Sequence, residues 1–151
     1  ALTSQEILDK QVKNTSFYYD SYVRLNGKTT KEPTLKCNGT IMTKFADNTD
    51  MYVGTLTADE IIYAGGKVNT NNMDYYLIND YQKTNNLYFW SLSPDEFGGN
   101  HDHAFGVRNY GYVYSTFVDY LNSFRPAVTL LSSTQITGGN GTKANAYTIA
   151  D

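Results

Sequence analysis

Two segments of the chain carry the pattern of a short helix. The first covers residues 3–13 and has the threonine–glutamate spacing of a capping box, although its apolar stripe is thin. The second covers residues 57–64, where Thr57 caps, Glu60 closes the box and Gly65 supplies the left-handed exit. This second helix is only about two turns long, so packing rather than intrinsic propensity must hold it.

Most other apolar positions are grouped as short strands between turn signals. We expect strands at 16–25, 35–45 (turning at Asn38-Gly39), 87–92, 104–108, 112–115, 125–131 and 146–149. Residues 93–97 read instead as a capped single turn, with Pro94 at its first helical position. Short strands, two short helices and many loops predict an α+β fold, in one domain that covers residues 1–151.

Composition fits a folded domain and excludes several classes of partner. The chain has 151 residues, of which 18% are charged and 15% aromatic, and tyrosine contributes 14 of the aromatic side chains. A net charge of −3 argues against binding to a nucleic-acid backbone, which needs an excess of Lys and Arg. No run of apolar residues is long enough to span a bilayer, so we expect no membrane contact by this segment itself.

The sequence contains a single cysteine, Cys37. Alone it closes no internal disulfide, builds no zinc site of several thiolates and forms no CxxC redox pair. We interpret it as a small buried hydrophobic residue, with a bridge to a cysteine before Ala1 as the alternative.

The densest group of metal-ligand residue types lies at Asp95, Glu96, His101, Asp102 and His103. The two histidines alternate and would share one face of a strand. An HxH pair without a third fixed ligand is a weak signal, so we expect a polar, exposed loop with no metal and no cofactor.

The sequence contains no strong catalytic motif. No Ser/His/Asp triad can be proposed from spacing, and the glycine turn at 138–143 has neither the Walker nor the dinucleotide spacing. We therefore expect no enzyme. Arg125 lies in an apolar segment, between Phe124 and Pro126, so its charge needs a partner if it is buried. The expected candidates for an ion pair are the carboxylates of Asp59, Glu60 and Asp95.

One polar, aromatic stretch, residues 99–122, stands out as a candidate ligand-facing segment. Tyrosine mixed with Ser, Gly and Asn is the composition of antibody-like paratopes. The candidate binding residues are Asn100, His101, His103, Asn109, Tyr110, Tyr112, Tyr114, Phe117, Asp119, Tyr120 and Asn122. The alternative is that the tyrosines merely fill the faces of a small sheet.

Five motifs together resemble a known family. They are ADEIIYAGG (58–66), YFWSLSP (88–94), AFGV (104–107), FRPAVTL (124–130) and GGNGT followed by YTI (138–149). Their order and spacing resemble the C-type-lectin-like domains of surface and secreted proteins of gut Firmicutes and related bacteria. This resemblance implies two helices on a small twisted antiparallel sheet, with the N- and C-terminal strands paired. It also implies structural roles for Thr57, Glu60, Gly65, Trp90 and Arg125.

The same fold occurs in the variable proteins of diversity-generating retroelements and in formylglycine-generating enzymes. The former place their variable surface where residues 99–122 lie. The chain lacks the cysteine pair that forms the active site of formylglycine-generating enzymes. It also lacks the sugar-binding loop of calcium lectins, because the nearest match, Glu32-Pro33-Thr34, lies too early in the chain.

The resemblance therefore implies a non-catalytic recognition or adhesion domain, extracellular or at the cell surface. Its partner would be a protein or a glycan, and an N-terminal anchor or stalk before Ala1 is compatible with this function.

Two alternatives stay open. The chain can be the structural head of a pilin-like filament protein, with residues 1–15 as the stub of its stalk. It can also be a degenerate relative of the sulfatase-modifying enzymes.

Overall fold

The computed structural model describes residues 3–37, 40–41, 53–128, 130, 133–142 and 144–150. Its elements in chain order are α1 (Ser4–Val12), β1 (Phe17–Tyr18), α2 (Asp20–Leu25), β2 (Lys36–Cys37), β3 (Thr40–Ile41), β4 (Val53–Thr55), α3 (Ala58–Tyr63), β5 (Lys67–Val68), α4 (Asp80–Thr84), β6 (Phe89–Phe97), β7 (Asp102–Val107), β8 (Tyr112–Phe117), β9 (Pro126–Val128), β10 (Gln135–Gly138) and β11 (Thr148–Ala150). Short helices and short strands are mixed along the chain, which confirms the α+β class.

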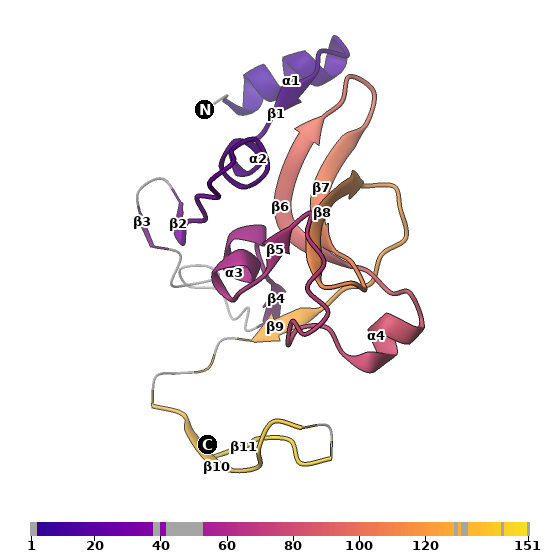
Figure 1. The fold of residues 1–151 in the computed structure, drawn as a ribbon. Coiled ribbons are helices and arrows are strands. Elements are labelled where there is room, and N and C mark those ends of the chain that lie inside the picture. Colours follow the sequence, from indigo (N-terminus) through magenta and orange to yellow (C-terminus); the bar gives the residue numbers. More distant parts are fainter. Residues whose placement is uncertain are drawn as a thin grey trace.

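A five-stranded sheet organises the molecule, in the order β1-β6-β7-β8-β5. Neighbouring strands are antiparallel except for β5 and β8, which run parallel. The long strands β6, β7 and β8 form its curled centre, with α2 and α3 to one side and α4 below (Figure 1). The register pairs Gly106 of β7 with Trp90 of β6 and with Tyr114 of β8.

The hydrophobic core lies on one face of this sheet. Alternate residues of the central strands point into it, and α2, α3 and the 75–78 turn cover them. The buried side chains of this core are Leu25, Ala58, Ile61, Val68, Tyr75, Ile78, Phe89, Phe105, Val107 and Val113. Burial of this apolar face is the main force that holds the short helices in place.

Local capping signals are confirmed at both predicted helices. α1 and α3 each begin with a complete capping box, formed by Thr3 with Glu6 and by Thr57 with Glu60. Gly65 has φ +97, so it supplies the left-handed exit of α3. These features depend on residues three or four positions apart, which is why the sequence reveals them.

The structure corrects three sequence predictions. Residues 93–97 belong to β6 and do not form a helical turn, and the register is irregular on both sides of Pro94. The strand expected over 16–25 is a two-residue strand followed by α2. A further helix, α4, was not expected, although Asn79 caps it and Gln82 completes its box.

The strands near the two ends of the chain do not pair with each other. β1 pairs with β6, and β11 pairs with β10. The pairing implied by the family resemblance is therefore not found between these strands. β9, inside the strand expected at 125–131, pairs with β4, but Pro126 and Val128 are exposed, so it is not a core strand.

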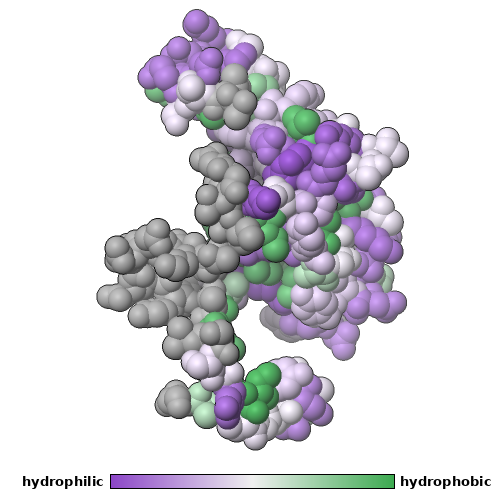
Figure 2. All heavy atoms as spheres, turned by 90° about the vertical axis from the view of Figure 1, so that its left-hand side faces the viewer, coloured by the Kyte–Doolittle hydropathy of each residue, from purple (hydrophilic) through white to green (hydrophobic). Residues whose placement is uncertain are grey.

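The C-terminal hairpin β10–β11 lies apart from the sheet (Figure 1). Ile136, Tyr147 and Ile149 are exposed on it. Hydrophobic residues are visible on its surface at the bottom of Figure 2. An isolated two-stranded hairpin is only marginally stable in water, so the pairing of β10 with β11 contributes little stability by itself. The Asn38-Gly39 turn and the side chain of Cys37 lie outside the described residues.

Candidate ligand-binding surface

The predicted ligand-facing segment, residues 99–122, forms β7, β8 and the start of the connection that follows them. The structure divides its members by exposure. Asn100, His101, Tyr110, Asp119 and Tyr120 are exposed, whereas His103, Tyr112, Phe117 and Asn122 are half-buried. Two predicted binding residues, Asn109 and Tyr114, are buried, so the structure places them in the interior and away from any ligand.

Tyr114 is buried because it packs in a cluster around Arg108. The guanidinium carbon of Arg108 lies 4.6 Å from the centre of the Tyr114 ring and 5.6 Å from the rings of Tyr88 and Tyr112. Arg108 also donates a hydrogen bond of 3.0 Å to the Tyr112 hydroxyl. Gly106 makes room, since a Cβ there would lie 3.1 Å from the Tyr114 ring. These tyrosines cover the outer face of the sheet, a structural role.

The exposed members of the segment lie at opposite ends of the β7–β8 hairpin. Tyr110 belongs to the turn between the strands, where Gly111 adopts φ +75. His101 and Tyr120 lie at the other end, around Phe117. Residues 99–122 therefore do not form one continuous surface.

We call the group at this second end the aromatic cluster: His101, His103, Phe117 and Tyr120. The Phe117 ring is its centre, with ring-centre distances of 5.2 Å to His101, 4.5 Å to His103 and 5.4 Å to Tyr120. The His103 Nδ1 lies 2.9 Å from a Glu96 carboxylate oxygen. The two histidines do share one face, but they pack on a phenylalanine. Within the described residues, no three His, Cys, Asp or Glu side chains converge as metal ligands.

Asp95, next to this cluster in sequence, points the other way. Its side chain is 0% exposed, and neither carboxylate oxygen has a hydrogen-bond partner in the described part of the chain. Burial raises the pKa of Asp95 to about 6, and the charge of Glu96 adds to this shift, while Ser115 and His103 oppose it. The Asp95 carboxyl is therefore largely protonated in mildly acidic solution and largely ionised at neutral pH.

The connection between β8 and β9, residues 118–125, exposes several large apolar side chains, and no sequence motif predicted this exposure. We call it the β8–β9 loop. Its large exposed apolar side chains are Val118, Tyr120, Leu121 and Phe124. Leu121 is fully exposed, and 62% of Phe124 is accessible. Because water solvates these groups poorly, four of them within seven residues make the loop a candidate contact surface.

Hydrogen bonds hold both ends of this loop. At the first end, the Val118 amide donates to the Asp102 carbonyl at 3.1 Å. At the second, the Ser123 amide donates to the Tyr88 carbonyl at 2.7 Å, and the Ser123 carbonyl accepts from the Trp90 amide at 3.0 Å. The backbone amide of half-buried Trp90 thus helps to fix the second end of the loop. Exposed Tyr120 and Leu121 lie between these two fixed ends, and exposed Phe124 directly follows the second.

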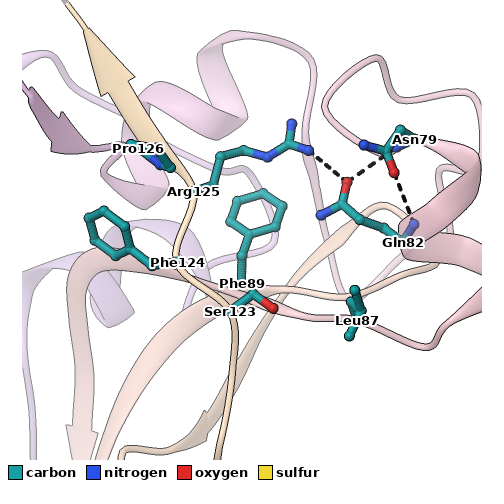
Figure 3. A pocket seen from close by; sticks show the side chains of 8 residues that line it. All are labelled: Asn79, Gln82, Leu87, Phe89, Ser123, Phe124, Arg125 and Pro126. Carbon is teal, nitrogen blue, oxygen red and sulfur yellow. Dashed lines mark hydrogen bonds between the residues drawn. The ribbon is translucent and has the colours of Figure 1, made fainter. Parts of the chain in front are cut away.

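A pocket of about 220 Å³ opens at the second end of the β8–β9 loop (Figure 3). Its walls come from α4 and its flanks, from the start of β6 and from the loop itself. The lining residues are Asn79, Gln82, Leu87, Phe89, Ser123, Phe124, Arg125 and Pro126. Four of the eight are apolar, three are neutral hydrogen-bonding residues, and Arg125 is the ionisable member of the set.

Arg125 lies across the floor of this pocket. Its guanidinium carbon is 5.1 Å from the centre of the Phe89 ring, and Nη2 donates a 2.7 Å hydrogen bond to Gln82 Oε1. Figure 3 shows the guanidinium reaching over Phe89 toward Gln82, whose Oε1 also accepts from the Asn79 amide at 3.2 Å. Burial lowers the pKa of Arg125, and Tyr75 partly opposes this shift. Because an arginine guanidinium loses its proton only in strongly alkaline solution, Arg125 stays charged at neutral pH.

The expected carboxylate partners of Arg125 are engaged elsewhere. Asp59 pairs with Arg24 of α2 and also accepts the Thr34 amide at 2.7 Å. Glu60 closes the capping box of α3, and Asp95 is isolated in the interior. Among the described residues, no carboxylate lies within ion-pair distance of Arg125. The prediction that one of these acids pairs with Arg125 is wrong.

No helix among the described residues is long and apolar enough to cross a membrane. Comparison with known proteins adds no relative to this picture. No protein-family model, no curated protein and no solved structure matches the chain.

Proposed function

We propose that this chain is a non-catalytic recognition domain that binds a protein or glycan ligand through the β8–β9 loop and the adjoining aromatic cluster. The observation that carries this proposal is the exposure of Val118, Tyr120, Leu121 and Phe124 within one short loop. Exposed apolar groups gathered in this way favour association with a partner, because binding removes them from water.

The chemistry beside the loop suits recognition. Tyr120 and His101 combine an apolar ring with a hydrogen-bonding group, and Asn100 and Asp119 offer exposed polar groups next to them. Such side chains give contact area together with hydrogen bonds of defined direction. Both ends of the loop are held by backbone hydrogen bonds, so less conformational freedom is lost on binding.

We extend the same proposal to the fold family and location. A C-type-lectin-like domain at the cell surface or outside the cell is supported by the five motifs in order, and the α+β architecture is compatible with it. If the chain is of the variable type, related chains will differ most in residues 99–122.

A selection experiment tests the proposed surface while the natural ligand is still unidentified. The native protein is screened against a phage-displayed peptide library and a glycan array, and every binder is then measured on two variants. The first variant carries Leu121→Ser and Phe124→Ser in the loop. The control carries Tyr76→Ser, a substitution of a side chain that is equally exposed but lies before α4.

We expect binders whose affinity falls at least about tenfold on the loop variant, the loss of roughly 1.4 kcal/mol of contact energy, and is unchanged on the control. Thermal unfolding of both variants should match the native protein, since the substituted side chains are exposed. The proposal is contradicted if no binder depends on the loop, or if the two screens yield nothing for the native protein.

A further inference from the structure

We propose that the pocket beside Arg125 binds a carboxylate of a protein partner, supplied by a C-terminal residue or by an Asp or Glu side chain. This inference rests on the proposed function, because it names the chemistry that the second end of the same loop recognises. The apolar side chains of the loop would then contact the residues next to that carboxylate.

The first argument is the unsatisfied charge of Arg125. A guanidinium presents five N–H donors in a rigid fork that matches a carboxylate, and one donor is used here, by Gln82. The rest of the wall is neutral, so nothing on it compensates the charge. Of the charged residues on α4, Asp80 is turned out to solvent and pairs with Lys83 at 3.7 Å. Among the described residues no anion contacts the guanidinium, so an incoming carboxylate would find donors that these residues leave free.

The second argument is the fixed position of that charge. Phe89 is 1% exposed and supports the guanidinium from below, while Gln82 holds one of its nitrogens. Gln82 is itself buried and tied to the N-terminal cap of α4. Apolar walls at Leu87, Phe124 and Pro126 lower the local dielectric constant, which strengthens a charge-assisted hydrogen bond.

The size and lining of the pocket favour a peptide over a sugar. Its 220 Å³ is below the range of roughly 300–1,000 Å³ that is usual for whole small-molecule ligands, so it suits one residue of a longer chain. Phe89 in its wall is 1% exposed and lies under the guanidinium, so it offers no free face on which a sugar could stack. The exposed side chain of Phe124, also in the wall, provides apolar surface that suits a neighbouring side chain of a peptide.

Four fluorescently labelled peptides test the inference on the full chain. Two have the sequence Ala-Leu-Phe, one with a free C-terminal carboxylate and one with an amide. The other two are C-terminal amides of Ala-Leu-Glu and Ala-Leu-Gln. Each is titrated by fluorescence anisotropy, and NMR follows the side-chain amide of Gln82, which lies against the guanidinium. Glucuronate serves as an acidic sugar probe.

We expect at least one acid to bind about tenfold or more tightly than its neutral counterpart, as a charge-assisted hydrogen bond would give, and to shift the Gln82 resonance. Preference for the free C-terminus alone, for glutamate alone, or for both identifies the source of the carboxylate and supports the inference. In Arg125→Met the preference for the acid should disappear.

A second variant keeps the test independent of Arg125 itself. Ser123 is exposed at the pocket wall, and Ser123→Tyr places a ring in the pocket while the guanidinium remains. We expect this variant to lose peptide binding while its thermal unfolding stays near that of the native protein.

The inference is overturned if the native protein shows no preference for acids, or if the preference survives in Arg125→Met. Binding of glucuronate with no binding of either acidic peptide would overturn the choice of a peptide. If instead peptides bind through Leu121 with no dependence on charge, the recognition surface stands and the carboxylate pocket fails. The two proposals can therefore be separated.

Discussion

Two half-buried arginines of this protein have opposite surroundings. Arg24, between α2 and α3, pairs with Asp59 in the interior and with Asp20 at 2.7 Å on its own helix. Arg125, at the end of the β8–β9 loop, has an aromatic ring below it and a neutral amide beside it. The first charge is neutralised within the fold, whereas the second faces a pocket.

This difference separates structural chemistry from binding chemistry. A buried charge is tolerated when its partner is close, so the Arg24–Asp59 pair explains how α2 and α3 are joined. A charge that is fixed but not neutralised keeps its capacity to bind an anion. The exposed side chain of Phe124 lines the same pocket as Arg125, which is why we propose binding at this end of the β8–β9 loop.

The largest effect is expected at the paired arginine. Arg24→Met leaves the Asp59 carboxylate buried without its cation and should lower the free energy of unfolding by about 3–5 kcal/mol. Chemical denaturation measures this change. Asp20→Ala is the matched control, because Asp20 contacts the same guanidinium from an exposed position and should cost less than about 0.5 kcal/mol. Equal effects of the two substitutions would refute a structural role for the buried pair.

Asp95 extends the comparison to a buried acid without a cation. Its pKa rises from 3.8 to about 6 in the folded protein, so the folded state binds a proton more tightly than the unfolded state. The contribution of Asp95 to stability is therefore greatest below pH 4 and falls by about 3 kcal/mol between pH 4 and 6, since one pKa unit corresponds to about 1.4 kcal/mol. Urea unfolding between pH 4 and 8 measures this slope.

The control for this prediction is Asp95→Asn, which keeps the shape of the side chain but removes its titration. The variant should lack the fall in stability between pH 4 and 6, and it should be more stable than the native protein at pH 7. A native protein whose stability is constant over this range would show that the Asp95 charge is compensated.

The contrast between local and distant contacts explains which features the sequence revealed. The capping boxes of α1 and α3 and the exit at Gly65 depend on neighbours three or four residues away, and they were predicted correctly. The β7–β8 hairpin was also predicted, because its alternation and its turn are continuous in sequence.

Features that depend on distant segments were not predicted. Pro94 reads as a helix start by itself, but pairing with β7 draws it into β6. The partner of Arg125 comes from α4, 43 residues away, a helix whose five residues show little periodicity. Composition identified tyrosines near the C-terminus, yet burial of Tyr114 beneath Arg108 depends on how three segments pack. The β8–β9 loop was included only as far as Asn122, so the sequence did not point to Phe124 and Arg125, which line the proposed pocket.

A smaller effect is expected at the pocket arginine. Arg125→Met removes one hydrogen bond and the stacking on Phe89, but it leaves no buried carboxylate behind, so it should cost about 1 kcal/mol of stability. Unfolding under the conditions used for Arg24→Met checks this value. A loss as large as that of Arg24→Met would mean that Arg125 is structural and would weaken the case for a ligand charge at the pocket.

The smallest effect on stability, and the most direct test of the recognition surface, belongs to the β8–β9 loop. In the Leu121→Ser, Phe124→Ser variant, both changes are at exposed side chains, so stability should change by less than about 0.5 kcal/mol per site. The affinity for peptides or glycans selected on the native protein is the decisive measurement. The account predicts at least about a tenfold loss of affinity with an unchanged unfolding midpoint. Unchanged affinity for every selected ligand would contradict it.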